Sequence, residues 1–181
     1  MAAAALPFGT QTGSRSQNKK PPFRANWCKT NFYRKGGFYM EVRELMNPSV
    51  VTIEPTSSAS LAARLISRHN VGSLPVCSSD GRLRGMVTDR DIVLRCIAAE
   101  EDPAQTMVRD IMTRNCATVA PGDDCREATR LMSTQQVRRL PVVEKGKLVG
   151  VISLADLARS HRFDMEAAQA LCEISENIVV R

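Results

Sequence analysis

Short apolar runs separated by polar turns appear twice along this chain, in LPVCSSDGRLRGMVTDRD (Leu74–Asp91) and in LPVVEKGKLVGVISLAD (Leu140–Asp156). In each stretch a turn-forming dipeptide, Asp80-Gly81 or Lys145-Gly146, separates two runs of strand-forming residues. This arrangement is typical of two antiparallel strands that are joined by a tight turn. The pattern therefore predicts two hairpins, one of Leu74–Cys77 with Arg84–Val87 and one of Leu140–Val143 with Leu148–Ile152.

Helical spacing precedes each hairpin. Apolar residues recur three and four positions apart at Leu61, Ala62, Leu65 and Ile66, and again at Ala128, Leu131 and Met132. Before each of these helices, an extended apolar run that closes at a proline predicts a first strand, over Val50–Ile53 and over Cys116–Val119. A helix is expected after each hairpin, and a last helix over Asp164–Glu176.

The similarity between the two halves is an internal duplication. A shift of 66 residues superimposes VRELM (Val42–Met46) on VRDIM (Val108–Met112), and a shift of 65 matches the segments after the hairpin turn. A sequence that repeats at a fixed spacing indicates that the fold is built from equivalent structural units. We expect a first repeat at 40–98, a linker at 99–107, a second repeat at 108–160 and a C-terminal helix in 161–181.

Residues 1–39 differ in composition from the rest of the chain. They hold seven of the 25 basic residues and no acid, which leaves 18 basic against 19 acidic residues from Met40 onward. This composition is found in organellar transit peptides. However, RKGGFYM (Arg34–Met40) can be back-translated into a bacterial ribosome-binding sequence before the codon of Met40. Our hypothesis is a non-native or disordered leader, with Met40 as the initiator.

The composition after Met40 argues against several classes of protein. The chain from Met40 onward has almost no net charge, so it lacks the basic surface that is typical of a nucleic-acid-binding protein. No apolar run approaches the roughly 20 residues that span a bilayer. The cysteines in this part form no C-x-x-C pair, which favours reduced thiols in the cytoplasm over disulfides or a metal site. We therefore expect a cytoplasmic protein without a nucleic-acid, membrane or metal partner.

The second copy, VRDIMTRNCATVAPGDDCREATRLMSTQQVRRLPVVEKGKLVGVISLADLA, resembles a cystathionine-β-synthase-type (CBS) domain, and the first copy resembles another. The resemblance covers about Met40 to Ser160 and is to small standalone bacterial CBS pairs, including the hypoxic-response type. It implies an α/β fold in which two tandem β-α-β-β-α repeats form one CBS-pair (Bateman) module. It also implies clefts that bind AMP, ADP, ATP, S-adenosylmethionine or NAD.

A signature of this family, Gly, two apolar residues, Thr or Ser, two free positions and Asp, is intact in both copies. It reads Gly85–Asp91 in the first and Gly150–Asp156 in the second. A carboxylate can accept hydrogen bonds from both hydroxyls of a ribose, and glycine permits close approach of backbone. The same spacing also begins helices, with Thr88 or Ser153 as the N-cap. Both roles are compatible with the sequence.

Two adjacent arginines distinguish the copies. Arg138 and Arg139 stand where the first copy has Gly72 and Ser73. A planar guanidinium binds phosphate oxygens bidentately, so the pair predicts unequal clefts. The alternative is a solvated pair at the start of a strand. The sequence leaves open which copy's cleft the arginines face.

We expect no catalytic or metal-binding residues, and no cofactor beyond a bound adenine nucleotide or adenosyl compound. The resemblance implies that the ligand is contacted by Thr52, Ile53, Ser73, Leu74, Pro75, Thr88, Asp91, Thr118, Val119, Arg138, Arg139, Leu140, Pro141, Ser153 and Asp156.

The function predicted from the sequence is that of a non-catalytic nucleotide sensor, read by an unidentified protein effector. The rival hypothesis is a dimeric interaction scaffold with no ligand. An enzyme is disfavoured because the two copies leave no room for a catalytic domain. We predict a homodimer. An apolar stripe on the last helix, Ala168, Leu171, Cys172 and Ile178, is expected either to be covered by the second copy or to dock on its own module.

Overall fold

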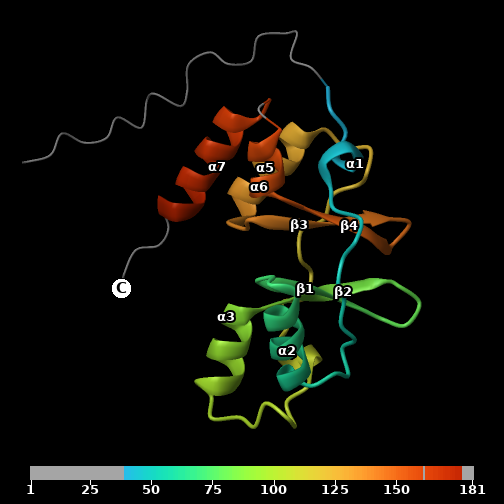
Figure 1. Ribbon diagram of the computed structural model, residues 1–181, viewed down its shortest axis with the longest axis vertical. Helices are drawn as coiled ribbons and strands as arrows, with labels where there is room; N and C mark the ends of the chain where they lie inside the picture. The colour runs from blue at the N-terminus through green and yellow to red at the C-terminus, as the bar shows by residue number, and fades with distance from the viewer. Residues whose placement is uncertain (1–38, 161, 177–181) are drawn as a thin grey trace, which may run out of the picture. The chain divides into compact units, whose positions relative to one another are not determined.

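Two antiparallel hairpins lie between two groups of helices (Figure 1). The computed structural model describes residues 39–160 and 162–176. One hairpin pairs β1 (Ser73–Cys77) with β2 (Leu83–Thr88), and the other pairs β3 (Arg139–Glu144) with β4 (Lys147–Ser153). Gly81 and Gly146 in the turns have φ of +80° and +82°, a conformation that glycine adopts without steric cost. Both predicted hairpins are confirmed.

The predicted first strands, Val50–Ile53 and Cys116–Val119, are wrong as strands. Only their last residues pair, Ile53 with Val76 and Val119 with Val142, each in a single parallel bridge. The reason is that the chain crosses between the repeats here. Asn47 pairs with Val151 of the second repeat before Ile53 reaches the first, so the intervening residues cannot follow one sheet.

The predicted helices before the hairpins are confirmed as α2 (Ala59–His69) and α5 (Cys125–Gln135). Side-chain oxygens cap their first turns, since Ser58 accepts from the Leu61 amide at 3.2 Å and Asp124 from the Arg126 amide at 2.9 Å. Both helices end in a left-handed residue, Asn70 or Gln136. Two of the apolar residues that recur at helical spacing, Ala62 and Ala128, are fully buried.

A helix follows each hairpin directly. In the first repeat, α3 (Asp89–Ile92) continues into a π-helical segment, η2 (Val93–Ile97), and in the second α6 (Leu154–Arg159) takes the corresponding place. The strand register pairs Ser73 with Thr88 and Arg139 with Ser153. Each hairpin therefore places the start of its first strand beside the start of the following helix.

The first helical turn of each repeat packs on the other repeat. In α1 (Val42–Leu45), the amides of Val42 and Arg43 donate to carbonyls of residues 123 and 121, and Val42 lies in the core of the second repeat. In α4 (Val108–Ile111), both Val108 and Ile111 lie in the core of the first repeat. The two repeats therefore complete each other and form one module, as predicted.

The C-terminal helix α7 (Asp164–Glu176) has the predicted bounds, but a different face docks. Ala167, Ala170 and Ile174 are buried against the second repeat, where α7 packs on α5 and α6. The predicted stripe does not dock on its own module, because Ala168, Leu171 and Cys172 are exposed. Ile178 lies outside the described residues, as does the predicted leader except for Tyr39.

Candidate functional site

The signature acid of the first repeat belongs to a helix cap. Asp91 Oδ2 accepts hydrogen bonds from the Thr88 amide at 2.9 Å and the Thr88 hydroxyl at 2.8 Å, while Thr88 Oγ1 accepts from the Asp91 amide at 3.0 Å. This reciprocal arrangement is a capping box. It fixes the carboxylate in one position and leaves its side chain 13% exposed.

The second repeat builds the same arrangement. Asp156 Oδ2 accepts from the Ser153 amide at 2.9 Å and from the Ser153 hydroxyl at 2.5 Å, and the Asp156 side chain is 18% exposed. The Asp156 amide donates back to Ser153 Oγ at 3.3 Å. The capping interpretation of both signatures is therefore confirmed. Their ligand-binding role stays a prediction.

An arginine on the same helix occupies the second oxygen of each acid. Arg95 lies 3.3 Å from Asp91 Oδ1 and also donates to the Ile111 carbonyl at 2.7 Å, whereas Arg159 pairs with Asp156 Oδ1. Neither arginine was predicted from the sequence, although acid–base spacings of four and three residues on a helix signal such pairs. Among the described residues, Arg159 contacts only its own acid, Asp156, so a ligand hydroxyl would displace it more easily than Arg95.

The signature glycines leave room for the chain's own crossing segments. A Cβ atom at Gly85 would lie 2.5 Å from the Thr113 carbonyl oxygen, and one at Gly150 would lie 2.8 Å from Met46 Sδ and 3.0 Å from the Asn47 carbonyl oxygen. The predicted close approach of backbone is therefore present. The approaching backbone is that of residues 47 and 113, which pair with β4 and β2.

One arginine of the pair, Arg139, lies close to the first repeat. A Cβ atom at Gly72 would lie 3.6 Å from a guanidinium nitrogen of Arg139 and 3.7 Å from Asp89 Oδ2. Arg139 therefore lies close to the first repeat at the position where β1 begins. Both arginines are exposed.

Arg138, Arg139 and Ser153 come together in a groove of about 600 Å³. We call it the α6/α7 groove, because the helices α6 and α7 form its walls. Its remaining lining is Leu154, Ala155, Ala158, Asp164, Ala167, Ala168 and Leu171. Sequence reasoning missed the α7 wall, because the repeat pattern ends before this helix. The groove combines a mostly apolar wall with two guanidinium groups, a combination that suits an anion with an apolar part.

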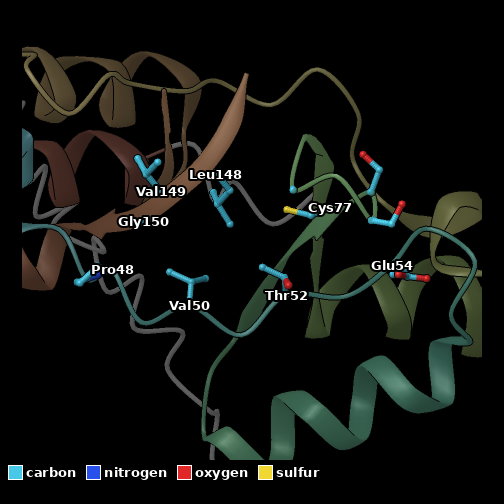
Figure 2. Close-up of a pocket in the computed structure, with 11 residues that line it drawn as sticks. Pro48, Val50, Thr52, Glu54, Cys77, Leu148, Val149 and Gly150 are labelled. Atoms are coloured by element: carbon cyan, nitrogen blue, oxygen red, sulfur yellow. The ribbon is translucent and has the colours of Figure 1, made fainter. Parts of the chain in front are cut away.

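Thr52 lines a different cavity, of about 360 Å³, which we call the inter-repeat pocket. Figure 2 shows Thr52 on the crossing segment with Pro48 and Val50, and Cys77 of the first repeat beside it. The second repeat contributes Leu148, Val149 and Gly150. The structure therefore places Thr52 in one hollow and Arg138, Arg139 and Ser153 in another.

Six other predicted residues are buried, so their side chains are not open to a ligand. They are Ile53, Leu74, Pro75, Val119, Leu140 and Pro141. Leu74 and Leu140 are among the largest fully buried side chains of the described chain. Ser73 is half-buried and Thr118 is exposed.

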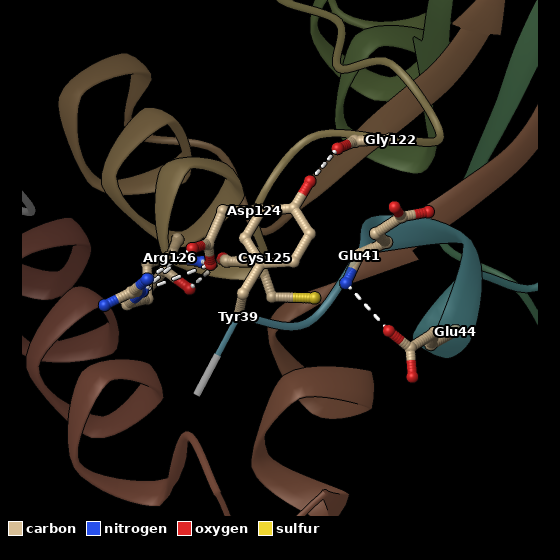
Figure 3. A network of polar contacts seen from close by, with 8 residues as sticks. Tyr39, Glu41, Glu44, Gly122, Asp124, Cys125 and Arg126 are labelled. Atoms are coloured by element: carbon tan, nitrogen blue, oxygen red, sulfur yellow. Dashed lines mark hydrogen bonds and ion pairs between the residues drawn. The ribbon is translucent and has the colours of Figure 1, made fainter. Parts of the chain in front are cut away.

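The start of α5 is joined to the segment that precedes α1, as Figure 3 shows. The Tyr39 hydroxyl donates to the Gly122 carbonyl at 2.6 Å, and the Cys125 amide donates to the Met40 carbonyl at 2.9 Å. Cys125 is buried at this junction. Burial, followed by the neighbouring carboxylates of Asp124 and Glu44, raises the pKa of the Cys125 thiol to about 11.

The thiols are therefore expected to differ strongly in reactivity. Iodoacetamide at pH 8 should modify the exposed Cys172 at least about 100 times faster than Cys125, because a raised pKa leaves little thiolate and burial blocks access. Peptide mass mapping over time measures both rates. In urea the two rates should converge. Equal rates in the native protein would show that the junction at Cys125 is open.

Comparisons with known proteins agree with this architecture. The family model described as CBS domain matches residues 42–97 and 108–161. The CBS domain-containing protein YhcV of Bacillus subtilis (strain 168) is 40% identical over 134 residues, which cover 74% of this chain and 94% of the relative.

Two solved structures extend the comparison. The crystal structure of Hypoxic Response Protein I with two coordinated zinc ions is 35% identical, with a TM-score of 0.63, and the match covers 66% of this chain and 98% of that one. The CBS domain pair of protein MJ0100, in complex with 5-methylthioadenosine and S-adenosyl-L-methionine, is 25% identical, with a TM-score of 0.62. That match covers 68% of this chain and 97% of the MJ0100 chain.

Proposed function

The chain belongs to the CBS domain family, and from this premise we propose that it is a non-catalytic regulatory module that binds an adenosine-containing ligand. The observation that carries the proposal is the pair of signature carboxylates. Asp91 and Asp156 are each fixed by a capping box, and each remains partly exposed. A fixed, partly exposed carboxylate can accept hydrogen bonds from a ribose diol without first being ordered.

The second repeat suits the ligand better than the first. Asp156 pairs with an arginine that is 74% exposed, so exchanging this arginine for ribose hydroxyls costs little. At Asp91 the corresponding exchange would also release Arg95 from the Ile111 carbonyl. We therefore place the stronger site at Ser153 and Asp156, with Arg138 and Arg139 nearby for a phosphate.

The adenosyl class of ligand is supported by the MJ0100 CBS pair, whose structure holds 5-methylthioadenosine and S-adenosyl-L-methionine. The zinc ions of Hypoxic Response Protein I have no evident counterpart in the described part of this chain. Its residues 39–160 and 162–176 hold no group of three or more His, Cys, Asp or Glu that could bind a metal ion.

The alternative remains a dimeric interaction scaffold without a ligand. It is favoured by the same capping boxes, because both signature acids already have partners without a nucleotide. In either case we propose a homodimer that transmits its state to a protein effector.

A cytoplasmic location is consistent with the five described cysteines, which are all free. None of the described helices is long and apolar enough to cross a membrane.

Thermal unfolding of the full chain with a ligand panel separates the two functions. A ligand that binds only the folded state raises the melting temperature, by several degrees at about 100 times its dissociation constant. We expect a rise with adenosine, AMP, ATP or S-adenosylmethionine, and none with 2′,3′-dideoxyadenosine at the same concentration, because that compound lacks the hydroxyls that the carboxylates would bind. No rise with any adenosine compound at millimolar concentration would favour the scaffold.

A further inference from the structure

A single arginine joins the signature acid of the first repeat to the start of the second repeat. One terminal nitrogen of Arg95 lies 3.3 Å from Asp91 Oδ1. The other donates to the Ile111 carbonyl oxygen at 2.7 Å and to the Thr113 hydroxyl at 3.2 Å. A guanidinium group is planar and rigid, so its two terminal nitrogens move together. A change in the contact with the acid therefore also changes the contact with residues 111 and 113.

The residues that Arg95 holds, which we call the 111–113 segment, belong to the contact between the repeats. In the sequence they open the second repeat, yet the side chain of Ile111 is 2% exposed and lies in the core of the first repeat. The Thr113 amide donates to the Met86 carbonyl at 2.8 Å, and the Met86 amide donates to the Thr113 carbonyl at 3.0 Å. Loosening this segment would therefore weaken the attachment of the second repeat to the first.

Arg95 occupies the oxygen of Asp91 that a ligand would need. Oδ2 of this carboxylate already accepts hydrogen bonds from the amide and the hydroxyl of Thr88. Oδ1 is the oxygen that faces Arg95. The Asp91 side chain is 13% exposed and the Arg95 side chain 46%, so solvent reaches both partners and the arginine can move away. A ligand hydroxyl that binds Oδ1 therefore competes with Arg95.

The second repeat is built differently at the matching position. Ser160 takes the place of Arg95, and its hydroxyl donates to a carbonyl of its own helical turn at 2.7 Å. The crossing segment itself is held alike in both directions, because Asn47, which matches Thr113, exchanges backbone hydrogen bonds of 2.8 and 3.0 Å with Val151. Among the described residues, the arginine link is thus an addition that only the first repeat has.

We propose that Arg95 is a positioning residue that couples Asp91 to the 111–113 segment. Without a ligand, the Asp91 carboxylate anchors Arg95, and Arg95 holds the segment on the first repeat. When ligand hydroxyls take Oδ1, Arg95 loses this anchor and the segment loosens. The coupling is reciprocal, because a segment that binds Arg95 less well leaves the acid more open to a ligand. The ligand step rests on the proposed function, whereas the coupling of acid and segment does not.

The two signature acids then have different tasks. Asp156, whose arginine contacts no other described residue, is the acid from which a ligand displaces its partner at lower cost. Asp91 gives up a partner that also holds the junction between the repeats. Occupation of the first site would therefore be transmitted to the junction, while occupation of the second would not.

Amide hydrogen exchange of the full chain without a ligand, followed by NMR, tests the coupling. In Arg95→Met the Thr113 amide should exchange at least about fivefold faster than in the wild type, because a charge-assisted contact with its segment is lost. The Asn47 amide, which has the matching bond to Val151, should keep its rate. Arg90→Met is the control, since the exposed Arg90 side chain makes no hydrogen bond or ion pair with a described residue. Arg95→Lys, which cannot span acid and carbonyl together, replaces Arg95→Met if the latter fails to fold.

The dependence on Asp91 separates coupling from a local effect of Arg95. Asp91→Asn keeps an oxygen for the helix cap but removes the charge that anchors Arg95, so it should speed exchange at Thr113 at least about twofold. The double variant should exchange no faster than Arg95→Met alone. Effects that multiply in the double variant would overturn the proposal. Equal rates in Arg95→Met and Arg90→Met, or an equal rise at Asn47, would overturn it as well.

Calorimetry with adenosine tests the ligand step, on the Asp156→Asn protein so that the site at Asp91 is measured. Adding Arg95→Met to this protein should tighten adenosine binding at least about threefold, because Oδ1 of Asp91 is then open. An arginine that only supports the fold would give weaker binding when it is removed, and that result would overturn the competition. If no protein binds adenosine, the proposed function fails at Asp91, and the exchange rates still decide the coupling.

Discussion

Gly85→Ala is expected to lower the free energy of unfolding by about 2–3 kcal/mol, because the new methyl group has no space. It would lie 2.5 Å from the carbonyl oxygen of Thr113 and 3.2 Å from Met112 Sδ. The oxygen cannot move alone, since the Thr113 amide donates to the Met86 carbonyl at 2.8 Å and the Met86 amide to the Thr113 carbonyl at 3.0 Å. The substitution should therefore separate the 111–113 segment from β2 and weaken the packing of this segment of the second repeat on the first repeat.

Urea unfolding followed by circular dichroism measures this effect. Gly122→Ala is the control, because a methyl group there would meet only the end of the Arg43 side chain at 3.5 Å, and its cost should be below about 1 kcal/mol. Gly150→Ala should fall between the two, since its nearest contact is the flexible Met46 side chain. Equal stability of the Gly85→Ala protein and the wild type would mean that the crossing segment is not held against β2.

The local elements were predictable from the sequence because local chemistry fixes them. Asp80-Gly81 and Lys145-Gly146 favour a tight turn whatever surrounds the hairpin. In both repeats a helix begins at a hydroxyl residue, Thr88 or Ser153, that stands three residues before an acid. The signature acids could be located for the same reason. Their spacing alone could not decide between a capping role and a ligand role.

The arrangement between repeats could not be predicted in this way. The match of Val42–Met46 with Val108–Met112 shows that the segments are equivalent, but it does not show that each packs on the opposite repeat. The first strands were mispredicted for this reason, since the residues near Val50 run from the second repeat to the first instead of pairing along one strand. The docking face of α7 was also missed, because alanines at 167, 168 and 170 give no clear apolar side, and the choice was made by packing against α5 and α6.

Replacing both Arg138 and Arg139 by alanine should weaken AMP or ATP binding by about ten- to a hundredfold. A charge-assisted hydrogen bond contributes about 1.5–3 kcal/mol, and this contribution is lost with the guanidinium groups. Adenosine should bind as it does to the wild type, because it has no phosphate. Since screening acts on the charged contact, raising the salt concentration should weaken AMP binding to the wild type more than to the variant.

Calorimetric titration measures these affinities, with an Arg64→Ala and Arg68→Ala protein as the control for the loss of two positive charges elsewhere. The control should bind AMP within about twofold of the wild type. If adenosine and AMP weaken equally in the Arg138→Ala, Arg139→Ala protein, the arginines shape the groove and do not bind the phosphate.

The most direct test of nucleotide binding is calorimetry on Asp156→Asn and Asp91→Asn with the tightest adenosine compound found. Asparagine keeps an oxygen that can accept the Ser153 or Thr88 amide, so the cap is largely preserved while the negative charge is lost. We expect the affinity to fall by at least about tenfold in Asp156→Asn, less in Asp91→Asn, and the melting temperature of both free proteins to stay close to that of the wild type. Unchanged affinity in both variants, together with lower melting temperatures, would contradict the account and leave the two acids as helix caps alone.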